Sequence, residues 1–151
     1  MTARTTVESQ TGAIYGVSAS LPATYDAAGY AALTYTTIGS VESCTPFGSN
    51  RPVSKFTPIN GAVQNMLGTP DFGSIDLVAG DIPTDAGQII MTAAEVSGAH
   101  HSVKVIYTDG EVFYFDVLVA SAIHNGSKAG DAKTIAYKCP INMRPTRVAA
   151  A

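Results

Sequence analysis

The sequence predicts a mainly β domain, either a β-sandwich or a β-barrel, with one flanking α-helix. Most of its apolar stretches are short, rich in β-branched and aromatic residues, and bounded by Gly or Pro, which is typical of strands. Only residues 85–98 show sustained helical spacing of apolar residues. Asp109-Gly110 separates two β-rich runs and indicates a tight hairpin. Together these features predict about eight strands and one helix packed on their side.

In the first part of the chain, strands are expected at residues 13–20 and 36–43. Gly39 weakens the second strand or marks a bulge. Between the two strands, residues 24–33 are compatible with one irregular helical turn, capped by Thr24 and interrupted at a glycine. The whole connecting segment is rich in tyrosine and has very few charges, so we expect it to lie in a core or against another molecule.

A helix is predicted over residues 85–98. Asp85 followed by Gln88 resembles a capping box, although Ser or Thr is the usual cap, and Gly98 stands where a left-handed C-terminal residue ends a helix. Five residues have the spacing of one buried stripe: Ala86, Ile89, Ile90, Ala93 and Ala94.

Residues 73–82 alternate as a strand with one apolar face, formed by Ile75, Leu77 and Ala79. The hairpin spans 103–121, and its second strand is apolar on both faces: Phe113, Phe115, Val117 and Val119 on one, Val112, Tyr114, Leu118 and Ala120 on the other. Such a strand needs cover on both sides, from the helix on one face and from a second sheet or a neighbouring subunit on the other. A turn at 124–131 leads to the last strand, 132–141.

Residues 44–70 contain four prolines and three glycines and form an unusually long loop, with short strands expected near 53–59 and 62–67. Long loops of this kind usually carry function or contacts. The expected organisation is an N-terminal arm at 1–12, a β domain at 13–141 and a C-terminal arm at 142–151. No apolar run opens the sequence, so neither a signal peptide nor a membrane segment is expected.

The chain of 151 residues is expected to form one domain, and only 14% of its residues are charged, which leaves much of its surface neutral and favours burial against a partner. The net charge of −3 argues against stable binding to nucleic acid. Residues 1–70 are neutral, 71–116 carry −7 and 117–151 carry +4. Folding either mixes these charges or produces two faces of opposite sign that meet head to tail between copies.

No pattern of catalytic or metal-ligating residues is present. His100 and His101 are adjacent on an expected strand and point to opposite faces, and no cysteine pair has ligand spacing. The acidic residues between 71 and 85 lack the spacing of a calcium loop, and no nucleophile elbow or phosphate loop occurs. Cys44 and Cys139 are expected to be buried thiols rather than a disulfide. The sequence therefore predicts neither an enzyme nor a cofactor.

Three stretches resemble the major tail tube proteins of long-tailed, siphovirus-like bacteriophages. LPATYDAAGYAALTYTTIGSVES (21–43) is similar to the family's opening, P-A-T-Y-D-A-A-G-aromatic running into T-x-I-G-E-V, with Gly-Ser-Val here in place of G-E-V. FGSIDLVAGDIPTDAGQIIMTAA (72–94) resembles its strand, D-x-x-D-A-G-Q motif and helix, and VKVIYTDGEVFYFDVLVAS (103–121) resembles its hairpin. The resemblance keeps a consistent order over residues 13–140.

The resemblance implies a protein that forms hexameric rings stacked into a hollow tail tube, with strands of each subunit contributing to a ring-wide inner β-barrel. The genome passes through the lumen without specific binding. Implied partners are other copies of the chain, a tape-measure protein, and the tail terminator and tail-tip proteins. The implied location is the virion tail, assembled in the cytoplasm of the bacterial host, without membrane insertion.

Within that picture three sets of residues are candidates for contacts. The 44–70 loop is expected to reach the next ring, and its deletion over 48–56 to leave a folded protomer that cannot stack. Candidate inter-ring contacts are Arg51, Lys55, Phe47 and Asp81; candidate residues buried between subunits are Tyr25, Tyr30, Tyr35 and Tyr114; candidate lumen residues are Asp76 and Asp116. Each of the two aspartates has the alternative of pairing with a lysine across the sheet.

Three other functions remain compatible with the sequence. A carbohydrate-binding or other ligand-binding β-sandwich would need an exposed aromatic platform, and the chain contains no Trp. A virion decoration module would share the β architecture. A tube protein of a secretion system would have the same architecture in a different machine.

Overall fold

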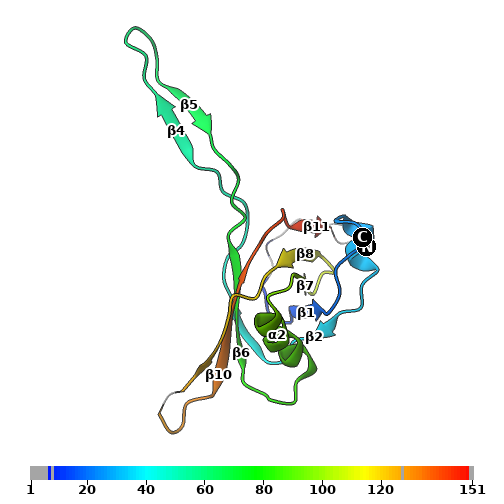
Figure 1. Cartoon of the computed structure of the whole chain (residues 1–151). Coiled ribbons are helices and arrows are strands. Elements are labelled where there is room, and N and C mark those ends of the chain that lie inside the picture. The colour runs from blue at the N-terminus through cyan, green and yellow to red at the C-terminus, as the bar shows by residue number, and fades with distance from the viewer. Residues whose placement is uncertain (1–6, 8, 127, 150–151) are drawn as a thin grey trace.

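The computed structural model describes residues 7, 9–126 and 128–149 of the chain. This part forms a body of two packed β-sheets and two helices, from which a long two-stranded arm projects (Figure 1). The mainly β fold with a flanking helix is as the sequence predicts.

The strands belong to three antiparallel sheets. The five-stranded sheet contains, in order, β11 (Thr146–Val148), β8 (Val112–Val117), β7 (His101–Ile106), β1 (Ile14–Ser18) and β2 (Thr36–Thr37). The four-stranded sheet contains β3 (Val41–Cys44), β6 (Ser74–Gly80), β10 (Thr134–Pro140) and β9 (Ser121–Asn125). The arm consists of β4 (Val53–Phe56) and β5 (Gln64–Leu67), and the helices are α1 (Ala27–Ala31) and α2 (Ala86–Ser97).

The core lies between the five-stranded and the four-stranded sheet. Alternate residues of each strand point into it, because side chains in a strand alternate between the two faces. The predicted inward set of β6, Ile75, Leu77 and Ala79, is fully buried. Their counterparts from the other strands are Val17, Val103, Val105, Phe115, Val117, Ile135, Tyr137 and Cys139.

The predicted strand 36–43 is divided between the two sheets. Residues Thr36–Thr37 pair with β1, whereas Val41–Cys44 pair with β6. The chain changes sheets at Gly39-Ser40, where Ser40 adopts a left-handed φ of 57° and its carbonyl accepts a hydrogen bond from the Gly80 amide. The glycine that suggested a bulge therefore marks the crossing from one sheet to the other.

The second strand of the predicted hairpin also divides. The Asp109-Gly110 turn joins β7 to β8 as expected, but β8 ends at Val117 and the chain then enters β9 in the four-stranded sheet. Strand β9 was not predicted as a separate element. Strand β11 was not predicted either, because it lies in the expected C-terminal arm. It pairs with β8, and Arg147 Nε of β11 lies 2.9 Å from Glu111 Oε1 beside the start of β8.

Helix α2 begins and ends as predicted. Asp85 caps it by accepting a hydrogen bond from the Gln88 amide, and Gly98 ends it in a left-handed conformation. The predicted stripe is wrong in part: Ala94 is buried and Ile90 is half-buried, but Ala86, Ile89 and Ala93 are exposed. The helix is rotated so that its buried residues are Gly87, Gln88, Met91 and Ala94.

The rotation follows from polar contacts that apolar spacing does not reveal. The Gln88 side chain donates to the carbonyls of Gly80 (2.7 Å) and Gly39 (3.2 Å) and accepts from the Ile82 amide (3.1 Å). Gly87 lies directly against the backbone of Thr37 and Ile38, where any side chain would clash. These contacts fix the first turn of α2 at the point where the chain crosses between sheets.

Helix α1, not α2, covers the outer face of β8. Tyr30 is buried and stacks on Tyr114 with ring centroids 5.3 Å apart, and Tyr35 lies 6.0 Å from the same ring. The cap of α1 is Asp26, whose carboxylate accepts from the Gly29 amide and from the hydroxyl of Thr24, the residue expected to be the cap. The tyrosine-rich segment is thus packed on its own sheet.

Replacing Gln88 by Met should lower the free energy of unfolding by about 2–5 kcal/mol, because two carbonyls and one amide lose their only side-chain partner while the volume is kept. Urea denaturation of the dissociated protomer measures this. The matched control is Glu95→Met, an exposed position on the same helix, which should change stability little. Equal stability of the two variants would contradict the role assigned to Gln88.

Candidate assembly surfaces

The outer face of the four-stranded sheet is not covered by any other element in the described part of the chain. On the two central strands this face consists of Ser74, Asp76, Val78 and Gly80 on β6 and Thr134, Ala136, Lys138 and Pro140 on β10. Asp76, a lumen candidate, lies opposite Lys138 in the strand register. On these two strands one aspartate and one lysine stand among uncharged residues, so this part of the face has no net formal charge.

Both edges of the four-stranded sheet are open. Strand β3 has only β6 as a neighbour, and β9 has only β10, among the described residues. An open edge exposes unpaired backbone groups that pair readily with another strand. Such a sheet can be extended on both sides by copies of itself.

The other lumen candidate, Asp116, is buried in the protomer. Its carboxylate lies 3.3 Å from His100 Nδ1, and the same nitrogen lies 3.2 Å from Asn142 Nδ2. Because Asp116 is on the face of β8 that α1 covers, its side chain does not reach an open surface. Its partner is therefore a histidine rather than the lysine considered from the sequence.

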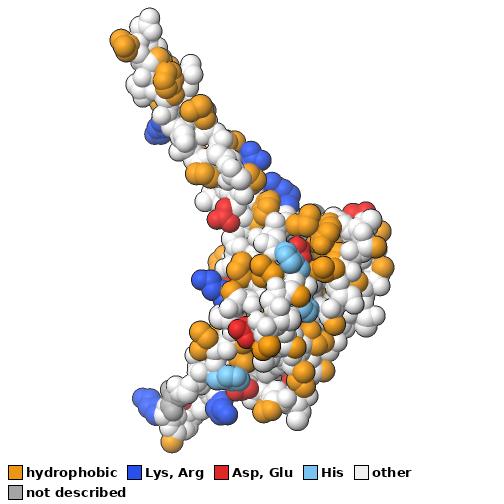
Figure 2. Space-filling view, viewed as in Figure 1, with side chains coloured by type: hydrophobic (Ala, Val, Ile, Leu, Met, Phe, Trp, Pro, Cys, Tyr) orange, Lys and Arg blue, Asp and Glu red, His pale blue; other side chains and the backbone are white. Residues whose placement is uncertain are grey.

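The arm carries apolar side chains that no other described part of the chain covers. Both of its strands are exposed along their whole length, and the strands pair from Val53↔Leu67 to Phe56↔Gln64. Figure 2 shows apolar side chains spread along the arm. Its exposed large apolar residues are Val53, Phe56, Ile59, Val63, Met66 and Leu67. An isolated two-stranded ribbon is only marginally stable in water, so this arm needs a partner surface.

The four candidate inter-ring residues lie in different surroundings. Arg51 and Lys55 are exposed on the arm. Phe47 packs into the body, with its ring 4.8 Å from Phe115 and 5.1 Å from Phe113. Asp81 follows β6 at the other end of the body and accepts a hydrogen bond from His124 at 2.8 Å.

The candidate tyrosines are mostly used within the protomer. Tyr30 and Tyr114 are buried, Tyr35 is half-buried under the Lys104 ammonium, and only Tyr25 remains 44% exposed. Burial, together with the nearby Asp116 carboxylate, raises the pKa of Tyr30 to about 12. Burial also raises the pKa of Tyr35 and of Tyr114.

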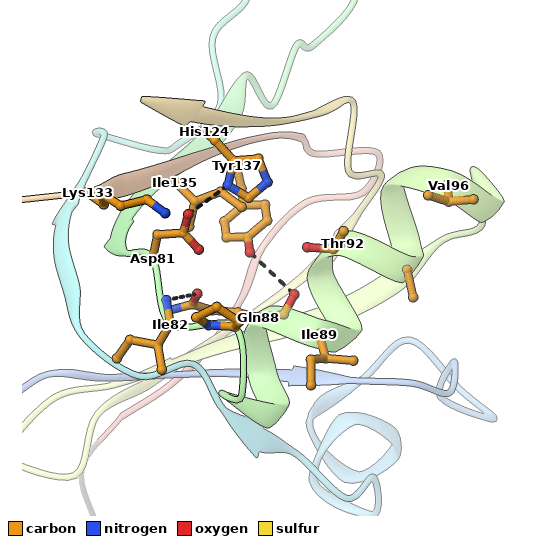
Figure 3. A pocket seen from close by; sticks show the side chains of 12 residues that line it. Asp81, Ile82, Gln88, Ile89, Thr92, Val96, His124, Lys133, Ile135 and Tyr137 are labelled. Atoms are coloured by element: carbon orange, nitrogen blue, oxygen red, sulfur yellow. Dashed lines mark hydrogen bonds and ion pairs between the residues drawn. The ribbon is translucent and has the colours of Figure 1, made fainter. Parts of the chain in front are cut away.

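An apolar groove lies between α2 and the β9–β10 hairpin, and the sequence did not predict it (Figure 3). Its volume is about 600 Å³. Ile89, Ala93 and Val96 of α2 line one wall, while Ile135 and Tyr137 of β10 form the floor. Asp81, His124 and Lys133 stand at one end. The signal was present in the sequence, because Ile89 and Ala93 belong to the stripe that was assigned to the core.

A metal site, a disulfide and a membrane-spanning helix each set requirements for the described residues. No group of three or more His, Cys, Asp or Glu side chains is placed to hold a metal ion in this part of the chain. Cys44 and Cys139 are free thiols, and burial raises the pKa of Cys139 to about 12. Neither helix has the length and apolarity that crossing a membrane requires, within the residues described.

Comparison with known proteins gives a match in structure but not in sequence. No protein-family model and no curated protein matches the sequence. Among solved structures, a chain of the six-fold symmetrised baseplate of the anti-feeding prophage has a TM-score of 0.70 at 10% identity, covering 96% of this chain and 97% of that one. A chain of the tail of the empty GTA particle has a TM-score of 0.67 at 12% identity, covering 94% and 99%. The SPP1 tail tube has a TM-score of 0.64 at 12% identity, covering 91% and 76%.

The chain has a tail-tube fold. The same fold occurs in tube, baseplate and terminator structures of phage-like particles and contractile injection systems, including the sheath and tube terminator of an extracellular contractile injection system. The open sheet face, the two open edges and the arm are therefore surfaces of a fold that is found in assembled particles.

Stability should fall as the pH rises from about 10 to about 12, because the folded pKa of Tyr30 is about 12 and the unfolded value is about 10. The folded state holds the phenol proton more tightly, so its contribution is complete below pH 10 and is lost as the pH passes the folded pKa. Tyrosinate absorbance and the free energy of unfolding, measured across this range, test this. Tyr30→Phe keeps the stacked ring and should lose less stability over the same range; an identical loss would exclude Tyr30 as a contributor.

Proposed function

We propose that the protein is a structural tail tube protein, which forms hexameric rings that stack into a tube for the passage of a genome. The observation that carries this proposal is the four-stranded sheet with an open, nearly neutral face and two unpaired edges.

In the proposed ring, β3 of one copy pairs with β9 of the next. This pairing removes both open edges of the four-stranded sheet and produces a continuous inner barrel, which gives a reason why neither of these edges is blocked among the described residues. The outer face of β6 and β10 then faces the lumen. Asp76 is the proposed lumen acid, with Lys138 beside it in the register.

A lumen of this composition suits the passage of DNA. Phosphates bind where basic side chains are concentrated, and each contact strengthens retention. The open face has one lysine offset by one aspartate, and its other residues on β6 and β10 are uncharged. It therefore offers no basic track that would hold the genome.

In the proposed stack, the arm reaches the next ring. It extends away from the body (Figure 1), it carries the exposed cations Arg51 and Lys55, and its apolar side chains lack cover in the protomer. Residues 1–12 and the end of the chain after β11 are proposed to add further contacts between copies. Residues 1–6, 8 and 150–151 of these arms lie outside the described residues.

A tube of defined length needs proteins that set its length and close its ends. The proposed partners are other copies of the chain, a tape-measure protein inside the tube, and terminator and tip proteins at its ends. The proposed location is the virion tail, assembled in the cytoplasm of the bacterial host.

A second candidate is a tube component of a contractile injection system. The observation in its favour is that the anti-feeding prophage and the extracellular contractile injection system provide neighbours with TM-scores of 0.70 and 0.68. Both candidates use the same protomer surfaces. They differ in the cargo that passes through the lumen.

The purified protein should form rings or hollow rods as its concentration rises. Size-exclusion chromatography with light scattering measures the mass of the species, and negative-stain microscopy of the largest one shows its shape. Hollow rods with six-fold rings support the proposal. A compact monomer that stays monomeric at high concentration and with an added tail-tip complex contradicts it.

Replacing residues 52–69 by a short Gly-Ser loop should leave a folded protomer that forms rings but does not stack. The replacement keeps the pair of backbone hydrogen bonds between Asn50 and Asp71 at the base of the arm. Circular dichroism checks the fold and microscopy counts rings per particle. Tubes of normal length would show that the arm does not connect rings.

A further inference from the structure

Two uncovered apolar surfaces of the described residues differ in shape. One is the arm, a thin ribbon with apolar side chains on both faces, and its tip residue Ile59 is fully exposed. The other is the groove between α2 and the β9–β10 hairpin, a concave surface with Ile89 54% and Val96 80% exposed. Every copy of the chain brings one ribbon and one groove, so the two occur in equal numbers in any assembly.

The two surfaces lie at opposite ends of one strand. The arm enters the body at the start of β6, and Asp81 and Ile82 of the groove follow the end of the same strand. Strand β6 is seven residues long, which corresponds to roughly 20 Å at about 3.3 Å per residue. Because the arm points away from the body (Figure 1), it does not reach the groove of its own protomer.

The charges of the two surfaces are complementary. Residues 45–70 contain Arg51 and Lys55 and no acidic residue. Asp81 lies at one end of the groove and Asp85 caps the adjoining end of α2, while Lys133 is the lysine among the lining residues. The arm has two cations and no acid, whereas the end of the groove has Asp81, which accepts from His124, and the neighbouring Asp85 against Lys133. This difference favours one orientation of docking.

We infer that the distal half of the arm of one copy docks in the α2 groove of a copy in the neighbouring ring. Phe56, Ile59 and Val63 enter the groove, and Lys55 lies toward the end of the groove that Asp81 and His124 form. This inference rests on the proposed function and adds the acceptor surface for the arm. It also gives a reason for the exposed stripe of Ile89, Ala93 and Val96: these residues form a core that is completed only between copies.

Disulfide cross-linking tests the contact directly. The variant Ile59→Cys/Val96→Cys, assembled and mildly oxidised, should give a ladder of covalent oligomers on a non-reducing gel. The matched control is Ile59→Cys/Glu95→Cys, because Glu95 is exposed beside Val96 but does not line the groove. The unmodified chain controls for Cys44 and Cys139, which are free thiols.

A second variant separates docking from folding. Ile89→Asp changes an exposed side chain, so the protomer should keep its circular dichroism spectrum and thermal midpoint. We expect it to form single rings and to lose stacks of more than one ring, and to give no ladder when combined with the cysteine pair.

Each outcome decides a different claim. A ladder from the groove pair alone, with loss of stacking in Ile89→Asp, supports the inference. Tubes that form without that ladder, or an Ile89→Asp variant that fails to form rings, overturn the inference and assign the groove to another contact, while the proposed function stands. An unmodified chain that never forms rings or tubes overturns the proposed function and the inference with it.

Discussion

The amide of Gln88 is the interaction on which the arrangement of this domain depends. It joins the Gly39 carbonyl at the crossing between the sheets to the Gly80 carbonyl and the Ile82 amide after β6. Asp85 adds a second link by accepting from the Gly39 amide while it caps α2. The side chain of a residue at position 87 would prevent this approach, which is why glycine stands there. The position of α2 thus follows from Asp85, Gly87 and Gln88 at its N-terminal end, and the groove follows from the position of α2.

The elements that the sequence predicted well are those whose signals are local. The ends of α2 are set by Asp85 and Gly98, the hairpin by Asp109-Gly110, and the face of β6 by simple alternation. The elements that it missed depend on distant partners. Within residues 36–43 the signal at the crossing is Gly39, which indicates a bulge as readily as a change of sheet. Within residues 112–125 both halves have the same strand-like composition, so the point where the chain leaves one sheet for the other has no mark.

The candidate surfaces were harder to predict, for a physical reason. An apolar side chain has the same sequence signature whether it is buried within one protomer or is left for another copy. Tyr30 was assigned to a subunit contact and is packed on its own sheet, whereas Ile89 was assigned to the core and is exposed. The exposure of Ile89 follows from the direction in which Gln88 and Gly87 turn α2, and the burial of Tyr30 follows from its stacking on Tyr114. The long, punctuated 44–70 stretch, by contrast, showed its exposure through composition alone, and its paired strands project clear of the body.

The arm leaves the body at only one end, and this gives the protomer a direction. Copies joined through such a projection all point the same way, since a ribbon and a groove cannot exchange roles. A stack built from them has two chemically different ends. One presents unoccupied arms with apolar, cationic tips, and the other presents empty grooves bordered by carboxylates. A protein that starts such a stack and one that stops it would therefore need different surfaces, and neither would be able to bind at the wrong end.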